Sequence, residues 1–232
     1  MTTPTNFQRA RSEEQRAARR RAILDTAAAM LAEMPVAQVS LNELSRRVGL
    51  AKSNVLRYFE SREEVLLELL NLATRELVDG LDGALAEALE GAPPAARPDR
   101  VAGCVARELA ARPVLCDLIS AQAAVLERNI SPEVAARYKH AAIAGATALA
   151  SLIADRLPEL RREDAFRFVA GTVIVAGSVW AHARPSAAML AAYAADPALA
   201  VLCLDFEDTL RETLEVLLSG LLARARDAGL GS

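Results

Sequence analysis

The chain has 232 residues, of which 53% are hydrophobic, enough to bury a substantial core in one large domain or in a small domain attached to a larger one. Its formal net charge of −3 is unevenly spread: residues 1–60 carry ten Lys and Arg against six Asp and Glu, whereas residues 61–232 carry seventeen against twenty-four. A short basic head on an acidic body favours a polyanionic partner for the head and not for the body, unless the Arg excess belongs only to a solvated face.

The spacing of the cysteines and the lengths of the apolar segments indicate where in the cell the protein is expected. Cys104, Cys116 and Cys203 include no C-x-x-C pair, which argues against a disulfide framework and fits a reducing cytoplasm. The N-terminal residues lack the apolar core of a signal peptide, and the longest uncharged helical runs, 141–154 and 168–183, are shorter than the roughly 20 residues that cross a bilayer. We expect a soluble cytoplasmic protein without a membrane partner.

The predicted fold class is all-α, because Ala and Leu dominate and no Val/Ile/Thr alternation is bounded by turns. Capping patterns, Pro and Gly divide the first ninety residues into predicted helices. These span about residues 12–34, 40–48, 51 or 52–58, and 61–89. Residues 91–98 are rich in Pro and Ala and form the clearest linker. Later helices are expected at about 99–111, 113–128, 132–154, 162–183, 186–195 and 205–226.

The two short helices between residues 40 and 58 are too short to be stable alone, because helix nucleation is costly. Joined by a turn at Gly49, they form a helix-turn-helix pattern, which places the start of the second helix in a major groove. Lys52, Ser53 and Asn54 occupy that start, and Asn and Lys side chains are suited to base edges. Arg57, a turn later, suits a phosphate. The alternative is that these residues are only the solvated side of a helical hairpin.

Residues 21–70 resemble the DNA-binding domain of the TetR (tetracycline-repressor) family of bacterial regulators. The resemblance is carried by "ILDTAA", "LNELSRRVGL", "KSNVLRYF" and "ESREEVL", in the order and spacing of the family. It implies an N-terminal helix-turn-helix domain, residues 1–60, joined by a connecting helix, 61–90, to a helical-bundle domain for ligand binding and dimerisation, 61–232. Members are homodimers that bind double-stranded operator DNA and hold a small-molecule effector.

Several positions depart from the family pattern. Leu56 stands where a phosphate-binding Tyr is usual, and Tyr58 stands where His is frequent, so Tyr58 is a candidate to take over that contact. Arg62 replaces a usual Lys and keeps its charge, Pro35 replaces a turn Gly, and Ala51 replaces a frequent capping Ser, at a cost of about 1 kcal/mol. The predicted DNA-contacting residues are Ser40, Lys52, Ser53, Asn54, Arg57, Tyr58, Arg19 and Arg20.

The Arg-rich segment 9–21 precedes the first packed residues. We expect a partly disordered extension that follows the phosphate backbone or enters a minor groove. An ordinary solvated helix start, with Glu13 and Glu14 among the Arg residues, explains the same pattern.

The resemblance implies that the helices near 162–183 and 205–226 build a dimer interface, and two operator half-sites also require two recognition helices. The predicted interface residues are Ile174, Gly177, Ala181, Phe206, Leu210, Leu214, Leu217 and Leu221. A role in the core of one chain remains an alternative for part of this set.

An effector pocket needs a mostly apolar lining with a few oriented polar groups, so we expect a largely apolar effector. Polar or aromatic residues on otherwise apolar helices are the candidates: Cys104, Cys116, Ser120, Gln122, Thr147, Thr172 and Trp180. Taken singly, each of these residue types is more often a core residue with its polar group satisfied.

The leading hypothesis is a ligand-responsive transcriptional regulator, a repressor that binds a pseudo-palindromic operator and is released by its effector. Two His and three Cys are scattered and no Gly-rich loop occurs, so we expect no enzyme, catalytic residue, metal site or cofactor. A helical ligand-sequestering or protein-interaction module without sequence-specific DNA binding remains the alternative, because Leu56 departs from the family pattern.

Overall fold

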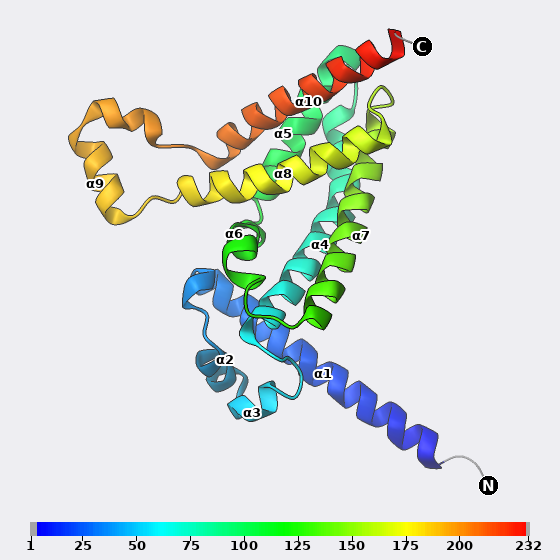
Figure 1. Ribbon diagram of the computed structural model, residues 1–232, viewed down its shortest axis with the longest axis vertical. Helices are drawn as coiled ribbons and strands as arrows, with labels where there is room; N and C mark the ends of the chain where they lie inside the picture. The colour runs from blue at the N-terminus through cyan, green and yellow to red at the C-terminus, as the bar shows by residue number, and fades with distance from the viewer. Residues whose placement is uncertain (1–3, 231–232) are drawn as a thin grey trace.

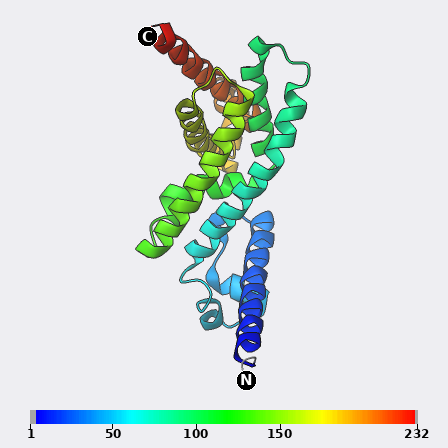
Figure 2. The same ribbon diagram turned by 90° about the vertical axis from the view of Figure 1, so that its right-hand side faces the viewer.

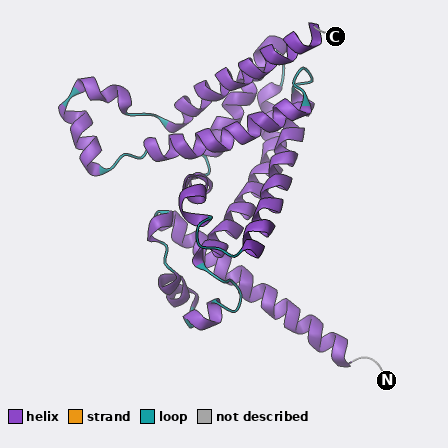
Figure 3. Cartoon of the chain, in the orientation of Figure 1, coloured by secondary structure: helices purple, strands orange, loops and turns teal. Residues whose placement is uncertain are grey.

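A computed structural model describes the backbone of residues 4–230 and the side chains of residues 13–226. Within the described backbone every regular element is helical, which confirms the all-α fold class (Figure 3). The α-helices are α1 (Pro4–Glu33), α2 (Leu41–Val48), α3 (Lys52–Val55), α4 (Arg62–Leu89), α5 (Arg97–Ala110), α6 (Pro113–Ala121), α7 (Pro132–Arg156), α8 (Arg162–His182), α9 (Ala187–Ala195) and α10 (Phe206–Leu230). Four shorter helical segments are η1 (Val36–Gln38), η2 (Pro94–Ala96), the π-helical η3 (Gln122–Leu126) and η4 (Pro197–Leu202).

The first three helices and η1 form one end of the molecule, which we call the head, and α4 to α10 form the body (Figures 1 and 2). The long helix α4 begins beside the head and runs into the body, where it packs against α5, α6 and α7. In the body, α8 contacts α6, α7 and α10, and α10 also packs along α5. One continuous hydrophobic core extends through both parts, so the head and the body are packed together through buried side chains.

Side-chain caps begin the helices where the sequence predicts them. Ser40 Oγ accepts a hydrogen bond from the Glu43 amide at 3.2 Å, and Ser61 Oγ accepts one from the Glu64 amide at 3.1 Å. Each cap satisfies one of the amides that the first helical turn leaves without an intrahelical partner. Gly49 ends α2 with φ of +70°, a conformation that side chains with a Cβ rarely adopt. These predictions are confirmed.

The predicted start of the first helix at Ser12 is wrong, because α1 already begins at Pro4. Pro is tolerated in a first helical turn, and no helix breaker follows it before Pro35. The expected disordered extension over residues 9–21 is therefore also incorrect, since that segment is helical backbone. The side chains of Arg9 and Arg11 lie outside the described residues.

The recognition helix is shorter than the sequence predicts. α3 ends at Val55, and residues 56–58 continue as a tighter turn in which the Arg57 amide donates to Asn54 O and the Tyr58 amide donates to Val55 O. Such three-residue closures are common at helix ends, where no further intrahelical partner is available. The first turn of α3 keeps the predicted residues, so the shortening leaves the expected recognition surface in place.

The segment between α8 and α10 extends away from the body as an arm formed by α9 and η4 (Figure 1). Its apolar residues are largely exposed, among them Met189, Leu190 and Val201.

Helix α8 is apolar and long enough, by length and composition alone, to cross a membrane, with a mean hydropathy of 1.3 in its most apolar window. However, 44% of that window is buried inside the fold, and an apolar core helix has the same length and composition.

Candidate nucleic-acid interface and ligand chamber

The recognition surface is built on two buried anchors. Val55 and Phe59 are 0% and 1% exposed and fix α3 and the turn after it against the head. The three residues before Val55, which are Lys52, Ser53 and Asn54, are all exposed, so α3 presents them to solvent. Since an adjacent buried residue sets their direction, these polar groups form a small surface of defined orientation. Such a surface can be inserted into a major groove.

A basic groove lies next to this surface, between α1 and the turn that follows α3. It has a volume of about 760 Å³ and is lined by Gln15, Arg16, Ala18, Arg19, Ala22, Arg57 and Tyr58. The guanidinium carbon of Arg16 lies 5.8 Å from the centre of the Tyr58 ring. Arg19 and Arg57 are exposed, so three guanidinium groups are available to an anion that enters the groove. Sequence reasoning missed Arg16, although its spacing of one turn from Arg19 and Arg20 was a usable signal.

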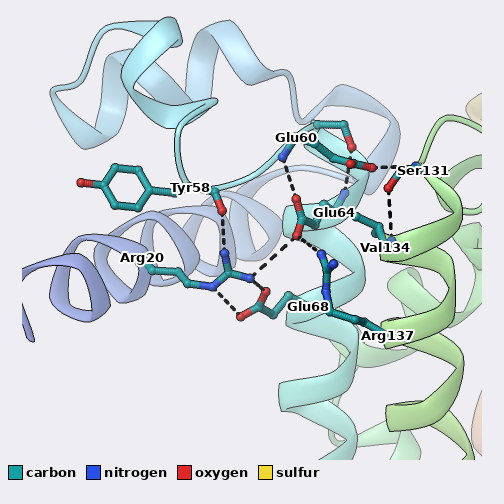
Figure 4. A network of polar contacts seen from close by, with 9 residues as sticks. Arg20, Tyr58, Glu60, Glu64, Glu68, Ser131, Val134 and Arg137 are labelled. Carbon is teal, nitrogen blue, oxygen red and sulfur yellow. Dashed lines mark hydrogen bonds and ion pairs between the residues drawn. The ribbon is translucent and has the colours of Figure 1, made fainter. Parts of the chain in front are cut away.

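Arg20, which the sequence predicts to contact DNA, has a different role in the structure. Its guanidinium forms two hydrogen bonds to Glu68 and donates to Tyr58 O at 2.6 Å (Figure 4). The guanidinium carbon also lies 4.1 Å from the centre of the Phe59 ring. These bonds hold Arg20 at the junction of α1, α4 and the turn after α3. It is therefore a residue that packs the head on α4, and the predicted DNA contact is not supported.

A buried carboxylate joins α4 to neighbouring elements at the same junction (Figure 4). Glu64 is 7% exposed, accepts a hydrogen bond from the Glu60 amide at 2.6 Å and another from Arg137 at 2.8 Å. Glu60 in turn accepts from the Ser131 amide at 2.7 Å. This network ties the beginning of α4 to the beginning of α7. The predicted capping box at Ser61 contained Glu64 but did not reveal its partner on α7, because that contact joins residues far apart in the sequence.

The exposed face of α2 carries a compact charge cluster. Glu43 accepts hydrogen bonds from both Arg46 and Arg47, and Arg47 also donates to Glu33 at 2.6 Å. The bonds from Arg46 and Arg47 lower the pKa of Glu43 to about 2. At neutral pH the cluster therefore balances part of the positive charge of α2. Ser40 is exposed beside this face, but its Oγ is already used as the cap of α2.

The body contains a largely enclosed chamber of about 60 Å³ between α4, α5, α6, α7 and α8. Its lining residues are Thr74, Leu77, Leu81, Val105, Leu109, Leu115, Ile119, Leu149, Ile153, Phe168, Val169, Thr172, Val173 and Ala176. Both hydroxyls in this set already donate to carbonyls of their own helices, Thr74 to Leu70 O and Thr172 to Phe168 O, at 2.8 Å each. The chamber thus offers a molecule an almost wholly apolar surface.

An open groove of about 280 Å³ adjoins the chamber. It shares five lining residues with it: Thr74, Ile119, Leu149, Val169 and Val173. Its outer part adds polar side chains from α4, η3 and α7, namely Asn71, Gln122, Tyr138 and Lys139. Here Glu127 accepts hydrogen bonds from Gln122 and Lys139, both at 2.7 Å. The groove therefore lies against the chamber across a shared wall and is the candidate entrance to it.

The residues that the sequence predicts for the pocket are mostly elsewhere. Thr172 lines the chamber and Gln122 the groove, but the other five candidates, Cys104, Cys116, Ser120, Thr147 and Trp180, line neither. The Trp180 ring is instead packed edge-on against Phe206, with ring centres 5.0 Å apart. Cys116 donates its thiol to Leu109 O at 3.2 Å, and Thr147 donates to Ile143 O at 2.8 Å. These polar groups are satisfied within the chain, which the sequence pattern alone cannot distinguish from a ligand contact.

The predicted dimer-interface residues divide into three groups. Leu210, Leu214 and Leu221 are buried in the core of the single chain, at 0%, 0% and 5% exposure, so the interface prediction is wrong for them. Within the same chain, Leu217 packs against Gly171 and Gly177 against Ile119, while Phe206 contacts Trp180. Two predicted residues, Ile174 and Ala181, are exposed on α8, and Val216, which was not predicted, is exposed on α10. The predicted stripe of α10 is therefore the one that packs inside the chain, and its free stripe lies elsewhere on the helix.

Within the described residues no group of three or more His, Cys, Asp and Glu side chains is placed to hold a metal ion.

The chain is similar to known families of proteins. The family model "Tetracyclin repressor-like, C-terminal domain" matches residues 73–225, and the model "Bacterial regulatory proteins, tetR family" matches residues 23–69. No curated protein matches the chain.

Solved structures share the fold. A possible TetR family regulator from Streptomyces coelicolor has 18% identity and a TM-score of 0.55, over 88% of this chain and 98% of that one. A putative TetR-family regulator from Mesorhizobium loti has 15% identity and a TM-score of 0.52, over 90% and 96%. The fatty acid degradation regulator FadR from Bacillus halodurans has 16% identity and a TM-score of 0.51, over 88% and 96%. These identities indicate a shared fold only. Because a family model covers residues 73–225, more than half of the chain, the protein belongs to the TetR family of bacterial transcriptional regulators.

Proposed function

We propose that this chain is a ligand-responsive transcriptional repressor, which binds a pseudo-palindromic DNA operator as a homodimer and is released by a small, largely apolar effector. The observation that carries the proposal is the exposed surface of Lys52, Ser53 and Asn54 beside the basic groove of Arg16, Arg19 and Arg57. Residues suited to base edges thus lie next to residues suited to phosphates, which is the division of roles in a major-groove reader. In this proposal residues 1–60 bind DNA, and residues 61–232 bind the effector and dimerise.

A second copy of the chain is the proposed partner along α8 and α10. Ile174 is 73% exposed and Val216 is 74% exposed, and an apolar surface of this kind favours association. Two half-sites one DNA turn apart, about 34 Å, also require two recognition helices. The proposed dimer therefore uses the outward stripes of these helices, whose inward stripes form the core.

The chamber and its entrance groove are the proposed effector site. The chamber lining suits an apolar molecule, because it is almost wholly apolar and both of its threonine hydroxyls already donate their protons to carbonyls of their own helices. Since the effector and the operator favour different states, each must weaken the binding of the other by the same factor. A cytoplasmic location accords with these partners.

The test is selection of DNA from a random duplex library by the purified protein near 0.15 M salt, where nonspecific phosphate contacts are weakened. We expect recovery of an inverted repeat. Recovery of no preferred sequence by a folded dimeric protein would contradict the proposal and favour the ligand-sequestering alternative, in which Leu56 has replaced a phosphate contact. The selected duplex then supplies an assay for molecules that release the protein.

A further inference from the structure

Asp117 on α6 bridges the head and the body through both of its carboxylate oxygens. Oδ2 accepts a hydrogen bond of 2.8 Å from the backbone amide of Val36, the first residue of η1 in the head. Oδ1 accepts a longer one, 3.4 Å, from the indole Nε1 of Trp180 on α8. One side chain thus contacts the loop that joins α1 to α2 and a helix of the body at the same time.

Val36 is held from two sides. While its amide donates to Asp117, its carbonyl accepts a hydrogen bond of 2.8 Å from Arg62 at the start of α4. Its own side chain is 3% exposed. Because α2 begins only five residues later, the position of Val36 constrains the helix that supports the recognition surface. The head is therefore held between α4 and α6 at this residue.

Helix α6 also forms part of the chamber wall. Leu115 and Ile119, two residues before and two residues after Asp117, both line the chamber. Residues two apart in an α-helix point about 200° apart, so Asp117 lies on a different face from the two lining residues. The nine-residue helix is packed closely on α8, since a Cβ added at Gly177 would lie 3.2 Å from Ile119 Cγ2. A molecule that displaces α6 from the chamber would therefore displace Asp117 with it.

Trp180 is fixed by contacts that leave its N–H directed at Asp117. Its ring packs on Phe206, and the guanidinium carbon of Arg184 lies 4.8 Å from the ring centre. It is also the single tryptophan of the 232-residue chain. Its fluorescence therefore reports one location, the junction of α6 and α8 at the carboxylate that holds the head.

We propose that Asp117 is a positioning residue that couples the state of the chamber to the placement of the DNA-binding head. In the empty protein its carboxylate holds the Val36 amide. When the chamber fills, α6 moves outward, the bond to Val36 lengthens and breaks, and the head loses one of its two attachments at η1. The consequence for DNA and effector rests on the proposed function, but the attachment itself does not, and the two are tested separately.

The first experiment measures hydrogen exchange at the Val36 amide and the emission of Trp180 in full-length protein without DNA. Asp117→Ala removes both acceptors, and we expect about tenfold faster exchange at Val36, together with shifted emission. Asp117→Asn retains an oxygen for Val36, so exchange should stay within about threefold while the emission shifts, because an amide NH2 cannot accept from the indole. Asp99→Asn, an exposed acid on α5, is the matched control and should change neither. Unchanged Val36 exchange in Asp117→Ala, or an equal rise at all head amides, overturns the proposal.

The second experiment fills the chamber without an effector. Ala176→Leu adds apolar volume to the lining, and Val105→Leu is a milder filling variant in case the first does not fold. We expect faster exchange at Val36 in the filled protein, and no additional increase when Asp117→Ala is also present. A folded, filled protein with unchanged exchange at Val36 would show that the chamber and the head are not coupled through this residue.

The duplex recovered by selection gives the third readout. We expect Asp117→Ala to bind it about tenfold more weakly, and Asp117→Asn and Asp99→Asn to bind it within about twofold of the unmodified protein. If Val36 exchange rises but DNA affinity does not fall, Asp117 does not position the head for DNA, and the proposal is overturned while the proposed function stands. If no duplex is recovered, the proposed function fails, and the two DNA-independent experiments still decide whether Asp117 holds the head.

Discussion

Arg137 on α7 donates a hydrogen bond of 2.8 Å to Glu64, the buried third residue of α4 (Figure 4). The same carboxylate accepts from the Glu60 amide, and Arg20 of α1 lies 3.9 Å from it. Glu64 is therefore shared between three segments that are distant in sequence. Because it stands where α4 leaves the head, Glu64 contributes to the stability of this junction.

Replacing Glu64 by Ala is expected to lower the free energy of unfolding by about 1–3 kcal/mol, since two hydrogen bonds to a charged group are lost. The remaining Arg137 is 63% exposed and can be solvated, so no buried charge is left unpaired. Urea unfolding followed by circular dichroism measures the change. Glu76→Ala, an exposed acid on the same helix, is the control and should cost less than about 0.5 kcal/mol. Equal effects of both variants would contradict the role of Glu64.

Arg19 and Arg20 are neighbours in sequence with opposite expected roles. Arg20→Ala should destabilise the fold by about 1–2 kcal/mol, because its bonds to Glu68 and Tyr58 O are lost. Arg19→Ala should leave stability unchanged and reduce the salt dependence of DNA binding by about one unit in slope, the effect of losing one phosphate contact. Urea unfolding and DNA titration at several salt concentrations separate the two effects. If Arg20→Ala reduced the salt slope and Arg19→Ala destabilised the fold, Arg20 and not Arg19 would face the phosphates.

Asn54 and Arg57 should differ in the kind of DNA binding that each supports. Asn54→Ala is expected to cost about 1–3 kcal/mol on the preferred duplex and little on random DNA, because a base contact is lost. Arg57→Ala should weaken all duplexes to a similar degree and reduce the salt slope by about one unit. Titration of a preferred and a scrambled duplex measures both quantities. Equal, sequence-independent losses in the two variants would remove Asn54 from the recognition surface.

Leu56 is 42% exposed at the position where the family usually has a Tyr that binds phosphate. Leu56→Tyr should therefore add a hydroxyl at the DNA surface without disturbing the core. We expect about fivefold tighter binding of the preferred duplex, the effect of one additional hydrogen bond. Leu56→Phe provides the ring without the hydroxyl and is the matched control. If both variants bind alike, the missing hydroxyl is not what limits affinity here.

The three cysteines should react at different rates with a thiol reagent. Burial, together with the neighbouring charge of Asp117, raises the pKa of Cys116 to about 12, and burial also raises the pKa of Cys104. Both thiols therefore remain protonated at pH 8, whereas Cys203 is exposed in the arm. Titration with Ellman's reagent should give one reactive thiol in the folded protein and three in urea. Rapid reaction of three thiols in the folded protein would contradict the burial of Cys104 and Cys116.

The local rules of helix formation predicted most of the fold. Ser40 and Ser61 begin helices by accepting bonds from amides three residues later, and Gly49 ends α2 by donating its amide to carbonyls within four residues, so their effect is readable from a short segment. The same locality placed Lys52, Ser53 and Asn54 on one exposed turn. The start of α1 was mispredicted because Ser12 matches a capping pattern, yet nothing in the preceding residues interrupts a helix.

The sequence by itself determined the helical class, the order of the helices and the residues of the recognition turn, because these depend on neighbours along the chain. Only the tertiary structure decided that Arg20 binds Glu68, that Leu210 is buried inside one chain, and that Trp180 packs on Phe206. It also placed Asp117 against Val36, a contact between residues 81 positions apart. An apolar stripe or a polar side chain in a helix does not specify its partner, because the partner is selected by the packing of distant segments into one dense core.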